Sequence, residues 1–250
     1  MRQYLRFTLL IFLLPALNIT ITSAQESIRL DVSQYDRDIS KEDSTWTMME
    51  VQSDNLTNYS LIKNQGKKVI KATSDDAAGG LIYLTRIDPK EYPIIEWRWK
   101  VEGIIENGNF RKKNGDDYPA RIYITFDYDK SNLNFGDRVK YFAIKTFTTY
   151  RIPLRALNYI WANQAKQGTI APNPYTDWVY MIAAQSGRSK SGQWVVETQN
   201  ILEDYRDAFG ENPPDITGVA IMTDSDNTGG SATAYYGDIV FRKTAASTSR

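Results

Sequence analysis

The chain has 250 residues, of which 42% are hydrophobic and 24% are charged, and its 30 basic side chains balance its 30 acidic ones. This composition is typical of one globular domain, and the neutral balance argues against nucleic-acid binding, which needs a basic face. The absence of histidine and cysteine excludes Ser-His-Asp and Cys-His catalysis, zinc, haem and iron–sulfur sites built on those residues, and disulfides. The chemistry left is that of carboxylates, Tyr, Lys, Arg, Ser and Thr, and of oxygen-ligated cations.

Residues 1–24 are typical of an export signal. Arg2 and Arg6 precede an apolar run over 7–17, and small residues over 22–24 predict cleavage before Gln25. The run is shorter than the roughly 20 apolar residues that a membrane span requires, and no later stretch approaches that length. We therefore expect a signal peptide over 1–24, one domain over 26–243 and a disordered tail over 244–250. The mature protein is expected in the periplasm or outside the cell, and not embedded in a membrane.

Alternation of apolar and polar residues is the dominant pattern along the chain. It is strict over 94–101 and 120–127, and because strand side chains alternate between faces, each run predicts a strand with one buried face. Similar runs between turn signals predict further strands at 46–51, 68–72, 80–86, 140–146, 158–162, 179–184, 194–198, 219–223 and 234–242.

A single helix is expected, because Asn200 and Glu203 have the spacing of a capping box and Gly210 follows as a stop. Many short strands with one short helix predict an all-β fold. We expect a single jelly-roll-like antiparallel β-sandwich with one short helix.

Several motifs, in this order along the chain, resemble one exported bacterial family, the domain of unknown function 3047. They are Glu-Trp-Arg-Trp-Lys-Val over 96–101, Asp-Asp-Tyr-Pro-Ala-Arg-Ile-Tyr over 116–123, Gly-Gln-Trp over 192–194, and the runs over 204–211, 222–229 and 236–239. The resemblance covers roughly residues 45–242 and implies no activity. A broader likeness, through Tyr-Gly-Asp-Ile over 236–239, is to jelly-roll sandwiches of the carbohydrate-binding and galactose-binding-like kind. That likeness implies the fold and suggests a glycan ligand.

Ligand-binding candidates cluster on the polar faces of the two alternating runs. If residues 94–101 and 120–127 lie in one sheet, that face collects Glu96, Arg98, Lys100, Arg121, Tyr123 and Asp127. Arginine offers paired donors to an acidic group, so the face suits a polyhydroxylated or anionic glycan. The alternative is a solvated face with cross-strand ion pairs.

Two further pairs are candidates. Asp116 and Asp117 follow the polar loop 107–115, where they would bind a cation or act as acid and base, or else cap a turn and pair with the loop's cations. Tyr159 and Trp161 alternate on one strand face, either as a ligand platform or as core.

The segment 224–230 begins like a calcium loop, with Asp224, Asp226 and Thr228 at the first, third and fifth positions. Its twelfth position is Tyr235 and not glutamate, so it is not an EF-hand. It is either a Ca²⁺ site within a sandwich loop or an Asx-rich turn. We expect no required cofactor, and calcium or magnesium where a metal is bound.

The function that these features favour is binding of a glycan or cell-envelope polysaccharide. The first alternative is a polysaccharide-active enzyme, either a hydrolase with two carboxylates or a lyase using Tyr123 with Arg98 and Arg121. The second is an envelope structural or partner-binding protein. The sequence does not decide whether the protein is catalytic.

Overall fold

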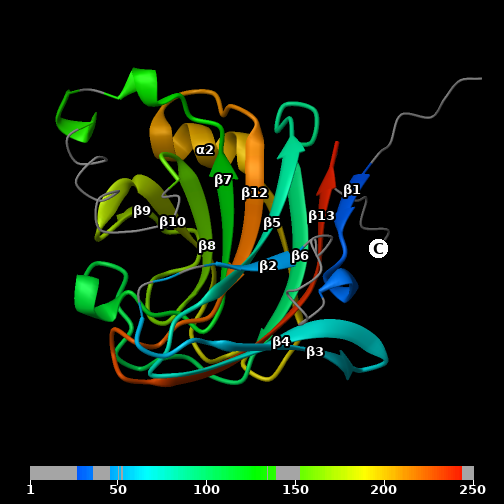
Figure 1. The fold of residues 1–250 in the computed structure, drawn as a ribbon. Coiled ribbons are helices and arrows are strands. Elements are labelled where there is room, and N and C mark those ends of the chain that lie inside the picture. The colour runs from blue at the N-terminus through cyan, green and yellow to red at the C-terminus, as the bar shows by residue number, and fades with distance from the viewer. Residues whose placement is uncertain are drawn as a thin grey trace, which may run out of the picture.

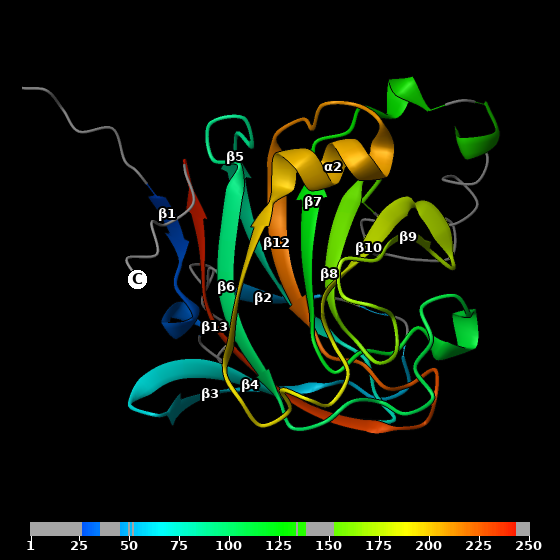
Figure 2. The ribbon, with the colours of Figure 1, turned by 180° about the vertical axis from the view of Figure 1, so that it is seen from behind.

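The computed structural model describes residues 27–35, 46–49, 51, 53–133, 135–138 and 153–243. Two β-sheets pack face to face, and a short helix lies across one end of the sandwich (Figures 1 and 2). The predicted all-β sandwich with one short helix is therefore confirmed. None of the helices within these ranges is long and apolar enough to cross a membrane.

The six strands of the first sheet, here sheet A, follow the order β11-β6-β13-β4-β3, and β1 pairs with β13. Their bounds are β1 Ser27–Leu30, β3 Asn58–Asn64, β4 Lys67–Asp75, β6 Ile94–Val101, β11 Val195–Asn200 and β13 Ser231–Arg242. Every strand pair in this sheet is antiparallel.

The seven strands of the second sheet, sheet B, follow the order β2-β5-β12-β7-β8-β10-β9. Their bounds are β2 Trp46–Met49, β5 Gly80–Ile87, β7 Arg121–Phe126, β8 Ala156–Ala162, β9 Ile170–Asn173, β10 Thr176–Ser186 and β12 Ile216–Met222. The pair β8–β10 is parallel, a departure from the wholly antiparallel sandwich that was expected. Short 3₁₀ turns, η1 Val32–Gln34, η2 Lys113–Gly115 and η3 Lys130–Asn132, lie in the connections.

Most predicted strands are present, and β6 has the predicted bounds. The strands β1, β3 and β9 were not expected; β9 is short, contains Pro172 and lies at a sheet edge, where a missing backbone N–H is tolerated. The strand predicted at 140–146, the signal at 1–24 and the tail at 244–250 all lie outside the described residues.

Residues 94–101 and 120–127 do not share one sheet, so the condition for a combined polar face is not met. β6 lies between β11 and β13 in sheet A, whereas β7 lies between β12 and β8 in sheet B. Both strands bury their apolar faces in the same core, so their polar faces point away from each other. Period two shows which side chains face the core, but it does not show which strands pair.

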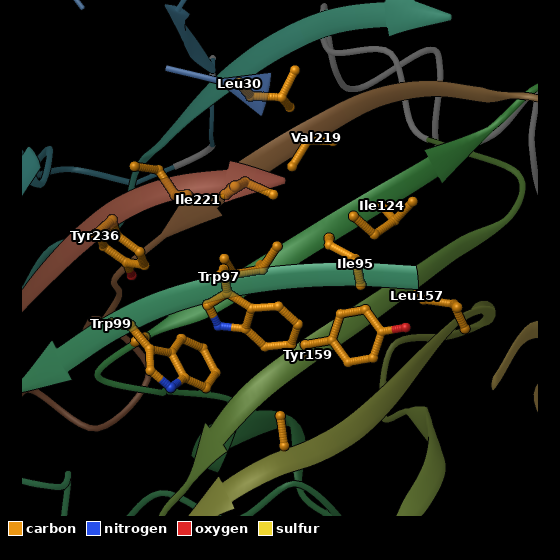
Figure 3. Close-up of a cluster of buried hydrophobic side chains, with 14 of the residues drawn as sticks. Leu30, Ile95, Trp97, Trp99, Ile124, Leu157, Tyr159, Val219, Ile221 and Tyr236 are labelled. Carbon is orange, nitrogen blue, oxygen red and sulfur yellow. The ribbon is translucent and has the colours of Figure 1, made fainter. Parts of the chain in front are cut away.

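The core between the sheets is aromatic. Trp97 and Trp99 of β6 lie 5.1 Å from Tyr159 and 5.8 Å from Trp161 of β8, between ring centroids. All four are fully buried, and Figure 3 shows Trp97, Trp99 and Tyr159 converging from the two sheets. Packing of such large rings supplies much of the free energy that holds the sheets together.

The helix α2, Ile201–Phe209, forms as the capping pattern predicts. The Asn200 side chain accepts hydrogen bonds from the backbone N–H groups of Leu202 and Glu203, and Gly210 ends the helix in the left-handed conformation with φ 73°. Tyr205 packs on Phe126 of β7, with ring centroids 4.7 Å apart. The helix thus closes one end of the core.

The first turn of α2 carries a half-buried acid that makes stability depend on pH. Burial raises the pKa of Asp204 to about 6, although the hydrogen bond from the Tyr159 hydroxyl at 2.7 Å opposes the shift. The native state therefore binds the proton more tightly than the unfolded chain. This contribution to stability is fully present below the ordinary aspartate pKa, is lost as the pH rises towards 6, and stays lost above it.

Replacing this carboxyl by an amide, Asp204→Asn, is expected to stabilise the protein at neutral pH by about 1–3 kcal/mol. The amide oxygen still accepts the Tyr159 hydrogen bond without a buried charge, and only a small helix-dipole term is lost. Thermal unfolding over a pH series checks this, and the gain should shrink towards the pH at which Asp204 is protonated. Asp54→Asn, an exposed aspartate that does not contribute to the pKa of Asp204, is the control. A gain that is absent, or that is independent of pH, would contradict the assignment.

Candidate ligand-binding site

Three loops meet at the end of the sandwich opposite α2. They are the β6–β7 connection with η2, the β8–β9 connection and the β12–β13 connection, and the first and third lie at the lower edge in Figures 1 and 2. Most of the acidic candidates from the sequence lie in or beside these loops. The site is therefore built from segments that are far apart in the chain.

Arg121, at the start of β7, holds the loops to sheet B. Its side chain is only 2% exposed; Nε donates to Asp224 Oδ1 at 2.7 Å and Nη1 to Asp116 Oδ1 at 3.3 Å. The remaining nitrogen, Nη2, pairs with Asp224 Oδ2, and Nη1 also donates to the Tyr123 hydroxyl at 3.2 Å. The donors of Arg121 are thus engaged inside the protein, and it anchors the loops.

Burial and charge act against each other in this cluster. Burial raises the pKa of Asp224 and that of Asp116, while the charge of Arg121 opposes both shifts. Paired carboxylates and a guanidinium in a dry setting are stable only while all partners are present.

Asp117 caps the β12–β13 loop. It is fully buried, and its carboxylate accepts hydrogen bonds from the Thr228 N–H at 2.7 Å, the Thr228 hydroxyl at 2.6 Å and the Asn227 N–H at 3.2 Å. This matches the turn-capping alternative for Asp117, with the β12–β13 loop as its partner in place of the loop cations.

The predicted metal ligands lie next to this cap. Carboxylate oxygens of Asp117, Asp224 and Asp226 lie within 4.8 Å of one another, so the fold adds Asp117 to the predicted set. The Thr228 hydroxyl, however, donates a hydrogen bond to Asp117, and Arg121 pairs with both carboxylate oxygens of Asp224. The geometry accounts for this cluster without an ion, and the calcium site stays a prediction.

A pocket of about 390 Å³ opens beside the cluster. Its walls combine two aromatic rings, two cations and three side-chain amides, and none of the described residues that line it is acidic. The lining residues are Gly108, Asn109, Phe110, Arg111, Tyr118, Ala162, Asn163, Gln164, Ala165, Lys166 and Thr169. Its size and its mixture of apolar and converging polar groups are typical of small-ligand sites.

Asn163 joins the two walls of the pocket. Its amide donates to the Asp117 carbonyl at 2.8 Å and accepts from the Ile105 N–H at 2.9 Å. This contact requires a glycine at 108, where an added Cβ would lie 1.9 Å from Asn163 Nδ2. Gln164 adds a hydrogen bond from Nε2 to the Glu106 carbonyl at 3.2 Å, so two side chains and one glycine tie the β8–β9 loop to the β6–β7 loop.

Tyr118 connects the pocket to the ion-pair cluster. The Arg121 guanidinium lies 4.5 Å from the centroid of its ring, and its buried hydroxyl has no hydrogen-bond partner in the part of the chain that the structure describes. Burial raises the pKa of this hydroxyl above its ordinary value, so it stays protonated at neutral pH as a hydrogen-bond donor.

Of the predicted ligand-binding residues, Asp116, Asp117, Arg121 and Tyr123 lie near one another at this site. Tyr159 and Trp161 do not: both are fully buried between the sheets. They belong to the core, as the alternative interpretation had it, because their strand face is the one that packs on sheet A. Glu96, Arg98 and Lys100 lie on the outer face of sheet A, so the lyase trio of Tyr123, Arg98 and Arg121 is not assembled.

The pocket residues themselves were not predicted from the sequence. The polar loop 107–115 was noted as preceding Asp116, but Phe110 was not singled out, and Asn163 and Lys166 come from a distant loop. Only the pairing of β7 with β8 brings the two loops together.

Comparison with known proteins decides the family. The profile described as "Protein of unknown function (DUF3047)" matches residues 44–240. The chain belongs to this family. The match confirms the resemblance seen in the sequence, and this family member has no match among the curated proteins.

Solved structures similar to this DUF3047 protein include three β-rich chains. The glycoside hydrolase domain of Endo-D from Streptococcus pneumoniae R6 has a TM-score of 0.35 and 10% identity, covering 80% of this chain and 21% of that one. The cellulose induced protein Cip1 has a TM-score of 0.36 and 12% identity, covering 87% of this chain and 97% of its own. A loop-swap mutant of Necallimastix patriciarum Xyn11A has a TM-score of 0.29 and 10% identity, covering 86% and 95%. Similarities with TM-scores this low do not support any conclusion about function.

Proposed function

We propose that this DUF3047 protein binds an acidic glycan, as an exported protein without catalytic activity. The observation that carries the proposal is the composition of the pocket between the β6–β7 and β8–β9 loops. Aromatic rings stack on sugar rings, amides bond to hydroxyl groups, and cations attract uronate carboxylates.

Charge supports an acidic ligand over a neutral one. Arg111 and Lys166 line the pocket, both are exposed, and neither is ion-paired within the described ranges of the chain. Arg111 Cζ lies 5.4 Å from the centroid of the Phe110 ring, so a cation and an aromatic face are presented together. A carboxylated sugar in the pocket would meet two positive charges, and no acidic side chain is among the described residues of the lining.

The same composition favours binding over hydrolysis. A glycosidase needs two carboxyl groups on either side of the scissile bond, whereas no acidic side chain is among the described residues that line the pocket. The nearby carboxylates of Asp117 and Asp224 are engaged by the loop cap and by Arg121.

Calorimetry with uronate oligosaccharides, and with neutral oligosaccharides of the same length, tests the proposal. We expect the uronates to bind, with an affinity that falls as salt is added. Phe110→Ala and Lys166→Gln should each weaken binding by about tenfold, the scale of one lost anchor or charge-assisted hydrogen bond. Lys90→Gln, an exposed lysine in the β5–β6 connection at the far end, should change nothing.

Product formation is followed in the same samples, by absorbance for unsaturated uronates and by assay of new reducing ends. Binding without product is the expected result. Turnover would overturn the non-catalytic assignment, and equal affinity for neutral and acidic oligosaccharides would overturn the choice of ligand. Affinity that Phe110→Ala and Lys166→Gln leave unchanged would overturn the pocket as the site.

A further inference from the structure

A second hollow, of about 350 Å³, lies on the outer face of sheet A, across β1, β6 and β13. Figure 2 shows the arrangement of these three strands. It is on the opposite side of the sandwich from the pocket, which adjoins the outer face of sheet B. Charged side chains dominate its walls: Arg29, Lys67, Glu96, Arg98, Asp238 and Arg242.

The charges in this hollow do not balance. Arg29 pairs with Asp238 at 2.6 Å, and Arg242 pairs with Glu96 at 3.2 Å. These pairs use both carboxylates of the lining and leave two cations, Arg98 and Lys67, with no acidic partner among the described residues. The hollow therefore carries an excess of positive charge.

The Arg98 side chain is positioned by an aromatic ring and a glycine. Its Cζ lies 4.5 Å from the centroid of the Trp194 ring, and that ring is fixed by a hydrogen bond from Nε1 to Asn64 Oδ1 at 3.0 Å. The Arg98 side chain also runs close over Gly237, where an added Cβ would lie 2.5 Å from its Nε. The glycine of the Tyr-Gly-Asp-Ile motif thus makes room for this arginine.

A cation–π contact engages the charge of the guanidinium and does not use its N–H donors in ordinary hydrogen bonds. Arg98 is half-buried, and no residue in the described ranges accepts a hydrogen bond from its guanidinium. A half-buried, oriented cation with unfilled donors is already arranged to receive a carboxylate, sulfate or phosphate through two parallel hydrogen bonds.

We propose that the hollow over β1, β6 and β13 is a second binding site, which takes an oxyanion group on Arg98 with Lys67 as the supporting charge. This goes beyond the proposed glycan pocket and does not depend on it. The oxyanion is either a free anion or a group carried by an acidic glycan, since both present the same oxygen atoms to the guanidinium.

The indole N–H resonance of Trp194 reports on this site, because the ring touches Arg98. Trp194→Phe identifies the resonance among those of the six tryptophans. Inorganic phosphate and a uronate oligosaccharide are titrated separately, and at least one should shift the resonance to saturation. A shift with phosphate alone supports a free anion, and a tighter response to the oligosaccharide supports the glycan source.

Arg98→Gln should weaken the response by about tenfold or more, the scale of a lost pair of charge-assisted hydrogen bonds. Arg98→Lys, which keeps the charge but not the paired donors, should fall in between. Lys166→Gln, in the other pocket, should leave this response unchanged. The two proposals can therefore be tested and overturned separately. No saturable shift with either probe, or a shift that Arg98→Gln leaves unchanged, overturns the second site.

Discussion

Replacing Arg121 by methionine is expected to lower the free energy of unfolding by about 3–5 kcal/mol, the usual cost of removing one partner of a buried ion pair. Methionine fills much of the volume but leaves Asp116 and Asp224 without their countercharge. It also releases the β6–β7 and β12–β13 loops from sheet B, because Arg121 bonds to both. Urea denaturation measures the loss.

Two further variants separate charge from shape at this position. Arg121→Lys keeps the charge without the fork of donors and should cost less than methionine. Adding Asp224→Asn to Arg121→Met removes one carboxylate that has lost its countercharge, and it should recover part of the lost free energy of unfolding. The double variant should therefore be more stable than the sum of the two single effects predicts. A loss below about 1 kcal/mol for Arg121→Met would place the pair in the class of surface ion pairs and contradict its anchoring role.

The second large effect is expected for Gly108→Ala. The new Cβ would lie 1.9 Å from Asn163 Nδ2 and 2.8 Å from the Asp117 carbonyl oxygen, so Asn163 must leave its place. Its departure leaves the Ile105 N–H and the Asp117 carbonyl buried without partners, at about 1–3 kcal/mol each. We expect a loss of about 2–4 kcal/mol in the free energy of unfolding, and a pocket that no longer binds ligand.

Gly103→Ala is the matched control, since nothing lies within 4 Å of a Cβ at that position in the same connection. It should change stability by less than about 0.5 kcal/mol. In an Asn163→Ala background, Gly108→Ala should cost less than in the native background, because the clash with Asn163 and its two hydrogen bonds are already gone and only the close approach to the Asp117 carbonyl oxygen remains. Equal losses of stability for Gly103→Ala and Gly108→Ala in the native background would contradict the assigned geometry.

The strands were predictable from the sequence because burial of one face imposes alternation. Over β6, Trp97 and Trp99 alternate with Arg98, and the structure buries the tryptophans as that pattern requires. Pairing was not predictable: β6 and β7 look like partners along the chain, but they lie in different sheets. Alternation shows which face of the sheet a side chain lies on, but it does not show which strand lies next to it.

Arg121 shows the same limit at the level of one residue. Its position on the polar face of β7 predicted exposure, but loops from elsewhere in the chain cover it, and it is buried with Asp224. The nearby carboxylates were selected correctly as belonging together near Arg121, because Asp116 and Asp117 immediately precede that strand. Their coupling to Asp224, more than a hundred residues away, depends on the sheet order.

The pocket could not be predicted from the sequence, for a related reason. Phe110 and Lys166 are ordinary residues in polar loops, and neither stands in a motif that calls for a ligand. They become a site because Asn163, packed against Gly108, and Gln164 tie their loops together. The family profile, which carries no activity, adds nothing to that geometry.

The most direct test of glycan binding is a titration of the labelled protein with a uronate oligosaccharide, followed by amide chemical shifts. We expect saturable shifts at Gly108, Phe110, Ala165 and Lys166, with little change in α2 at the other end of the sandwich. Shifts confined to other surfaces, or no shifts at concentrations that saturate known glycan binders, would contradict it.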